Sequence, residues 1–103
     1  MNTAPTNNPE ESNHTTLKVI ERLLGKDNFT LRCNSKFFEY VAIQRQPNGD
    51  IEVRDQRNFF TSAAKTLATI ILTPDGEIVK GDPARLYRLL ELANEWDNLG
   101  SPL

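Results

Sequence analysis

Residues 42–55 read AIQRQPNGDIEVRD, and residues 69–82 read TIILTPDGEIVKGD. Each stretch places proline, then asparagine or aspartate, then glycine, then an acidic residue between two apolar half-strands. Proline presets the φ angle at the first corner of a turn, and glycine adopts φ > 0 at little cost. The two stretches therefore predict two β-hairpins, and the position of each turn fixes which strand residues face one another.

The first hairpin has one aliphatic and one mostly polar face. A three-residue loop at residues 47–49 sets Gln46 opposite Asp50, and the pairing continues outward along both strands. Because side chains alternate along a strand, one face carries Val41, Ile43, Ile51 and Val53. The other face carries Tyr40, Ala42, Gln44, Glu52 and Arg54. We expect the first face to be buried and the second to meet water.

The second hairpin is apolar on both faces close to its turn. The same reasoning pairs Thr73 with Glu77, Leu72 with Ile78, Ile71 with Val79, and Ile70 with Lys80. Aliphatic side chains then lie on either side of the strand pair. We expect both sides to be covered, by helices or by another subunit.

Helix signals stand at both ends of the chain. Before the first hairpin, Thr15 or Thr16 supplies an N-cap hydroxyl, apolar residues follow at helical spacing, and Gly25 supplies the stop. After the second hairpin, Asp82 is an N-cap acid with proline directly behind it, and apolar residues at helical spacing extend the element over residues 83–99. These signals predict an N-terminal and a C-terminal helix.

Three further segments complete the expected fold. Residues 29–33 have strand composition, and residues 37–46 form the first arm of the first hairpin. Apolar residues within 58–67 match helical spacing and favour a short helix, the alternative being that residues 53–60 stay extended. The predicted fold class is α+β: an antiparallel sheet of about five strands built on the two Pro-(Asn/Asp)-Gly hairpins, with both terminal helices packed on it.

The 103 residues suit one domain, expected over residues 14–100. Residues 1–13 are polar and predict a disordered leader, and residues 101–103 a short tail. No apolar segment typical of a secretion signal follows Met1, and the single cysteine fits a reducing cytoplasm. A net charge of −2 argues against unspecific binding to DNA or an anionic membrane. We expect a cytoplasmic protein without a membrane partner.

Candidate catalytic groups are isolated from one another in the sequence. His14, the only histidine, lies in the polar leader, and Cys33 is best interpreted as a small buried hydrophobe. The sequence contains no zinc-ligand spacing, no Cys-x-x-Cys and no phosphate-binding glycine loop. The acidic residues around the two turns are explained by turn chemistry rather than by calcium. These patterns favour a protein that is not an enzyme and that uses neither a cofactor nor a metal.

The apolar excess points to a binding role. Paired phenylalanines at positions 37–38 and 59–60 cannot both enter one small core from an ideal strand, because neighbouring side chains point to opposite faces. A bulge or a strand end could still bring these rings into the core; the alternative is an aromatic surface for self-association or for a partner. From the second alternative we predict a small accessory or regulatory protein that docks on another protein, or on a second copy of itself. The contact candidates are Phe37, Phe59, Phe60 and Trp96.

The alternative is a single-stranded nucleic-acid-binding domain. Tyr40 and Arg54 share the expected wet face of the first hairpin, and Arg32 and Arg57 are placed to adjoin it. Exposed sheets with aromatic and arginine side chains stack single-stranded bases in several small domains. The acidic overall composition and Glu52 on the same face argue for the protein-binding hypothesis over this one.

Overall fold

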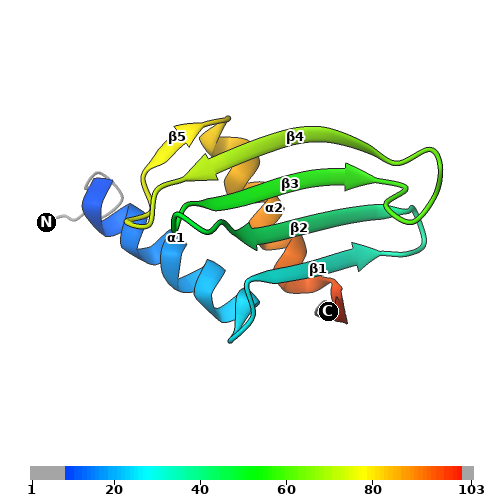
Figure 1. The fold of residues 1–103 in the computed structure, drawn as a ribbon, viewed down its shortest axis with the longest axis horizontal. Helices are drawn as coiled ribbons and strands as arrows, with labels where there is room; N and C mark the ends of the chain where they lie inside the picture. Colours follow the sequence, from blue (N-terminus) through cyan, green and yellow to red (C-terminus); the bar gives the residue numbers. More distant parts are fainter. Residues whose placement is uncertain (1–8, 101–103) are drawn as a thin grey trace, which may run out of the picture.

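The chain forms a single antiparallel sheet with two helices, so the predicted α+β class is confirmed. The computed structural model describes residues 9–100, with side chains over residues 12–96. The elements in chain order are α1 (Pro9–Leu24), β1 (Phe29–Asn34), β2 (Glu39–Arg45), β3 (Ile51–Arg57), β4 (Lys65–Leu72), β5 (Ile78–Lys80), α2 (Pro83–Glu95) and β6 (Asp97–Gly100). The strands lie side by side in the order β5-β4-β3-β2-β1-β6 (Figure 1).

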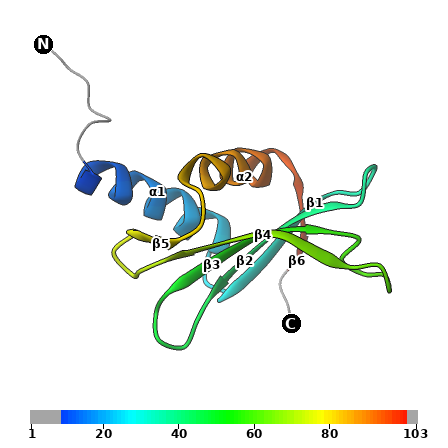
Figure 2. The same ribbon diagram turned by 90° about the horizontal axis from the view of Figure 1, so that it is seen from above.

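Both helices lie on the same side of the sheet, which we call the helix-covered face (Figure 2). The main core fills the space between them and the central strands. It consists of Ile20, Leu23, Leu24, Val41, Ile43, Ile51, Val53, Ile70, Leu72, Leu86, Leu89, Leu90 and Ala93. Among the described residues, no helix is long and apolar enough to cross a membrane.

Strands β2 and β3 pair in the register expected from the first turn. Gln44 lies opposite Glu52 and Ile43 lies opposite Val53, while the Gln46 amide donates to the Asp50 carbonyl at 2.7 Å. The aliphatic side chains of this hairpin enter the main core as expected. The opposite side, which we call the open face, is more buried than predicted. Tyr40 and Ala42 are buried there in a second cluster with Leu31 and Cys33, because the side chains of neighbouring strands close over one another.

The second hairpin departs from the expected pairing after its first residues. Leu72 lies opposite Ile78 as predicted, but an irregularity in the ladder then sets Ile71 opposite Lys80. The prediction that both faces are covered is wrong, because Val79 is 59% exposed. The reason is position: β5 has only three residues and forms the edge of the sheet. The chain leaves that edge at Gly81, where a Cβ would lie 2.9 Å from the Ile70 Cα.

Helix α1 begins earlier than predicted, at Pro9. Residues 9–13 of the expected leader are therefore helical, and His14 is an exposed residue inside the helix. Thr16 does not cap the helix; its hydroxyl donates back to the Ser12 carbonyl at 3.0 Å. Proline is favourable in the first turn of a helix, and the acidic residues that follow it interact favourably with the helix dipole. The helix can therefore begin within the polar segment. Residues 1–8 and the expected tail at 101–103 lie outside the described residues.

Helix α2 starts as predicted and ends earlier. Asp82 accepts a hydrogen bond from the Ala84 amide at 3.1 Å, and the helix stops at Glu95 rather than near Leu99. Trp96 is extended, and the chain continues as β6, which pairs with β1. Pairing along the edge of β1 supplies backbone hydrogen-bond partners that an isolated last helical turn lacks.

The short helix predicted over residues 58–67 is wrong, and residues 53–60 are not extended throughout either. Strand β3 ends at Arg57, residues 58–64 form a chain of turns, and β4 begins at Lys65. The turn starts at Asn58, whose φ is +54°, and the Thr61 amide donates to its carbonyl at 3.0 Å. Antiparallel pairing of β3 with β4 places this connection at an end of the sheet, where a helix has no core to cover.

Candidate functional site

Two connections far apart in the sequence meet at one end of the sheet. These are residues 35–38, between β1 and β2, and residues 58–64, between β3 and β4 (Figure 1). The Asn58 amide donates to the Phe38 carbonyl at 2.9 Å and joins them directly. We call the five aromatic residues gathered here the aromatic end: Phe37, Phe38, Tyr40, Phe59 and Phe60.

The aromatic end has a buried base and an exposed rim. Tyr40 is 6% exposed, and Phe59 is half-buried against it with ring centroids 5.8 Å apart. Phe60 contacts both rings edge-on, at centroid distances of 5.8 Å from Tyr40 and 5.1 Å from Phe59. It nevertheless remains 68% exposed, and Phe37 and Phe38 remain 63% and 53% exposed. The rim is thus a set of apolar side chains open to solvent, of which Phe60 packs on the rings beneath it.

Two residues of these connections adopt backbone conformations that L side chains rarely adopt. Phe38 has φ of +55° and Asn58 has φ of +54°. Asparagine tolerates this region because its short polar side chain bonds locally, but a bulky aromatic residue does so at a cost of about 1–2 kcal/mol. Backbone strain of this kind concentrates at functional sites.

Trp96 lies apart from the other predicted contact residues. It follows α2, is half-buried and packs against the main core. The structure therefore brings together Phe37, Phe59 and Phe60 and does not bring Trp96 to them. Sequence reasoning missed Phe38 as a contact candidate because it placed residues 37–46 in one strand, whereas residues 35–38 form a turn.

The four residues of the nucleic-acid alternative are divided between the two faces of the sheet. Tyr40 and Arg54 belong to the open face, but Tyr40 is buried. Arg32 reaches the end of α2 on the other face, donating to the Ala93 carbonyl at 3.0 Å and the Trp96 carbonyl at 3.4 Å. There its charge complements the negative end of the helix dipole. Arg57 also lies on the helix-covered face.

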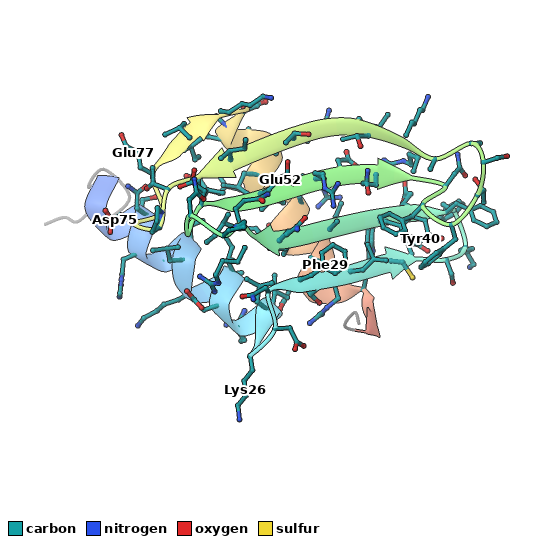
Figure 3. The ribbon with its side chains drawn as sticks, in the orientation of Figure 1. Lys26, Phe29, Tyr40, Glu52, Asp75 and Glu77 are labelled. Carbon is teal, nitrogen blue, oxygen red and sulfur yellow. The ribbon has the colours of Figure 1, made fainter. Side chains whose placement is uncertain are left out.

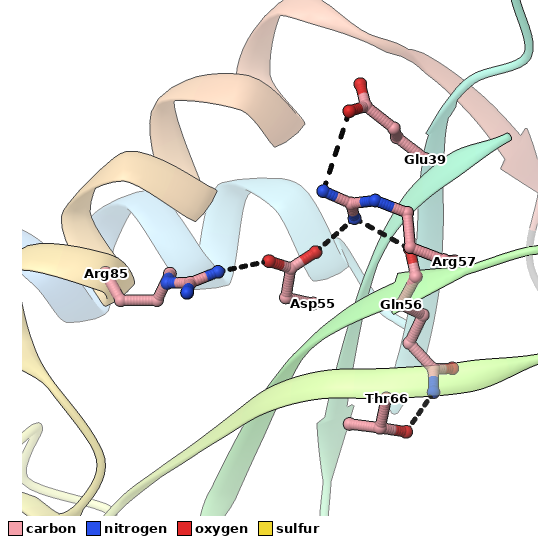
Figure 4. Close-up of polar contacts among 6 residues, drawn as sticks. All are labelled: Glu39, Asp55, Gln56, Arg57, Thr66 and Arg85. Atoms are coloured by element: carbon pink, nitrogen blue, oxygen red, sulfur yellow. Dashed lines mark hydrogen bonds and ion pairs between the residues drawn. The ribbon is translucent and has the colours of Figure 1, made fainter. Parts of the chain in front are cut away.

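Arg57 belongs to a charge network that ties the aromatic end to α2 (Figure 4). Its guanidinium contacts Asp55 and lies 3.5 Å from Glu39. Asp55 is 4% exposed and also meets Arg85 of α2, with nitrogen and oxygen 2.5 Å apart. Between β3 and β4, the Gln56 amide donates to the Thr66 hydroxyl at 2.5 Å. Each charge in this network has an opposite partner, so it serves to join helix to sheet.

The charges around the rim are less balanced. Lys36 and Lys65 are both exposed, and neither forms an ion pair within the described part of the chain. The open face carries the pair formed by Arg54 and Glu52, whose closest atoms are 3.7 Å apart. Arg54 Nε is buried and makes no hydrogen bond to the described residues.

Two side chains considered from the sequence as catalytic candidates lie in different environments. Cys33 is buried, as expected, and His14 is exposed on α1. Within residues 12–96 no three His, Cys, Asp or Glu side chains are grouped so that they could hold a metal ion.

Comparison with protein-family models, curated proteins and solved structures gives no match.

Proposed function

We propose that this chain is a protein-binding module, a small accessory or regulatory protein of the cytoplasm that docks through its aromatic end and does not catalyse a reaction. The observation that carries the proposal is the exposed rim. Phe37, Phe38 and Phe60 come from two connections that are joined by the Asn58–Phe38 hydrogen bond, and all three stay more than half exposed. Large apolar side chains gathered on a surface are typical of interaction sites.

The rim supplies enough apolar surface for a modest but useful affinity. Complete burial of a phenylalanine side chain contributes about 1.5–3 kcal/mol, and a third to a half of each rim ring is already covered. The three rings together therefore offer roughly 3–6 kcal/mol before the entropic cost of association. The contacts of Phe60 with Tyr40 and Phe59 reduce that cost, because they restrict this ring before binding.

Single-stranded nucleic acid fits this surface less well. Base stacking needs an accessible aromatic face, and Tyr40 is 6% exposed. Arg32 and Arg57 are occupied by carbonyl groups and carboxylates on the opposite side of the sheet from Arg54. A protein partner that accepts phenylalanine side chains requires none of these groups.

The proposal is tested by affinity capture from a native lysate with three forms of the protein. These are the wild type, the rim variant Phe37→Ser/Phe60→Ser, and the control variant Val79→Ser/Tyr87→Ser. The control removes two apolar side chains of similar exposure, 59% and 45%, from β5 and the outer surface of α2. We expect one protein to be retained by the wild type and the control and to be lost from the rim variant.

The captured protein is then purified and its affinity is measured directly by calorimetry. A dissociation constant that rises at least tenfold for the rim variant, with the control unchanged, supports docking through the aromatic end. Equal capture by all three forms would place the interaction elsewhere, and capture that disappears after nuclease treatment would favour the nucleic-acid alternative. Sedimentation equilibrium of the purified chain identifies self-association, which the rim variant should abolish if a second copy is the partner.

A further inference from the structure

The aromatic end is positively charged although the whole chain is acidic. Lys36 precedes the exposed phenylalanine pair at 37–38, and Lys65 follows the connection that carries Phe60. The carboxylates nearest to them are already engaged: Asp55 by Arg57 and Arg85, and Glu39 by Arg57. Two exposed ammonium groups therefore border the rim without a carboxylate to balance them within the described part of the chain.

The turns at the opposite end of the sheet carry carboxylates. Asp75 and Glu77 are exposed at the turn between β4 and β5, far from Tyr40 along the sheet (Figure 3). Asp50 adds a half-buried carboxylate at the neighbouring turn between β2 and β3. Exposed carboxylates are thus present at the end of the sheet away from Lys36 and Lys65.

We propose that the surface recognised by the aromatic end is an apolar protein patch bordered by aspartate and glutamate side chains, which Lys36 and Lys65 contact across the rim. The inference rests on the proposed function and specifies the chemistry of its partner. Complementary charges at the rim of an interface raise the association rate and exclude partners of like charge. For the same reason, two copies joined through their aromatic ends are disfavoured, because four lysines would then meet.

The test uses three synthetic amphipathic helices as probes. They share one stripe of leucine and carry glutamate, glutamine or lysine on the polar face. Binding is measured by fluorescence anisotropy at low and at physiological salt. Two exposed ion pairs predict that the glutamate peptide binds about tenfold more tightly than the glutamine peptide at low salt, and that salt reduces this preference. Amide chemical-shift changes should concentrate in residues 35–38 and 58–67.

Charge reversal provides the decisive comparison. The variant Lys36→Glu/Lys65→Glu should prefer the lysine peptide, whereas the control Lys18→Glu/Lys26→Glu should keep the wild-type preference. Lys18 and Lys26 are equally exposed but lie on α1 and just after it. Thermal unfolding confirms that each variant is folded. If the two double variants rank the three peptides identically, the inference is wrong.

The outcomes separate this inference from the proposed function. Loss of peptide binding by Phe37→Ser/Phe60→Ser, without any dependence on peptide charge, overturns the acidic border and leaves docking through the aromatic end intact. Binding of the glutamate peptide that is insensitive to the rim variant contradicts both. If no peptide binds and vesicles of phosphatidylserine and phosphatidylcholine do, the partner is a lipid surface and the acidic protein patch is excluded.

Discussion

The chain reverses direction at both ends of the sheet, but the two sets of connections differ. The turns at one end pack into the fold, whereas the connections at the other end leave apolar side chains exposed. At one end, which we call the proline end, two tight turns contain Gly49 and Gly76, with φ of +95° and +89°. Gly76 is buried against α1: a Cβ there would lie 2.7 Å from the Asn13 carbonyl oxygen and 2.9 Å from Leu17 Cγ. A Cβ at Gly49 would lie 3.1 Å from Pro74, so the two turns also pack on one another.

The aromatic end meets the same requirement for positive φ without glycine. Phe38 and Asn58 take that conformation, and the side chains beside them stay in solvent. The proline end thus uses the residue that minimises strain and buries it, whereas the aromatic end accepts strain and leaves apolar area exposed. Folding stability accounts for the first arrangement, and under the proposed function a binding partner would account for the second.

The largest effect is expected from Gly76→Ala at the proline end. The substitution combines an unfavourable φ with a collision against backbone, so we expect a loss of about 3 kcal/mol in the free energy of unfolding. Urea denaturation measures it. Gly25→Ala is the matched control, because Gly25 has φ of +63° and no atom within 4 Å of a Cβ. It should lose only the strain, about 1–2 kcal/mol. Equal losses would show that Gly76 is not held tightly against α1.

A smaller loss is expected from Asp55→Asn, which breaks the link between the aromatic end and α2. The amide cannot neutralise Arg57 and Arg85, which would then face each other across a buried site. We expect the free energy of unfolding to fall by about 2 kcal/mol, measured by urea denaturation. Glu91→Gln, at an exposed pair with Arg88, is the control and should be neutral. A neutral Asp55→Asn would mean that the network contributes no net stability.

The smallest change in stability is expected from Phe38→Gly. Glycine relieves the strain at φ of +55° but adds freedom to the unfolded chain, and the side chain removed is 53% exposed. The free energy of unfolding should therefore stay within about 0.5 kcal/mol of the wild type, while affinity for the captured partner falls about tenfold. A loss of stability as large as that of Gly76→Ala would show that Phe38 supports the fold and would remove the contrast between the two ends.

Local rules predicted the parts of the fold that depend on neighbours in sequence. The register of β2 with β3 followed from the turn at residues 47–49, and the start of α2 followed from Asp82. The predictions were wrong where the position of a segment depended on which strand it pairs with. Residues 97–100 joined the edge of β1 instead of extending α2, and β5 was left at the edge of the sheet.

The candidate site was predicted in part. The paired phenylalanines suggested an aromatic surface as one of two alternatives. Of the expected contact residues, Phe59 and Phe60 contact each other, and Phe37 lies on the connection hydrogen-bonded to theirs. Their meeting depends on the return of β4 along β3, which sets residues 58–64 beside residues 35–38. Burial of Tyr40 was not predictable from alternation alone, since the open face is closed over by neighbouring strands at that point.

By itself, the sequence determined the two proline turns, the pairing of the first hairpin, the class of the fold and the two adjacent phenylalanine pairs that an ideal strand cannot point into one core. These are local or compositional properties, fixed by φ preferences, alternation and residue count. Tertiary structure decided which side chains are covered and which charges remain unpaired. It joined two distant connections into one rim, placed Arg32 and Arg57 away from Arg54, and left Lys36 and Lys65 exposed. Exposure and charge balance depend on strand order, which no local pattern in the chain specifies.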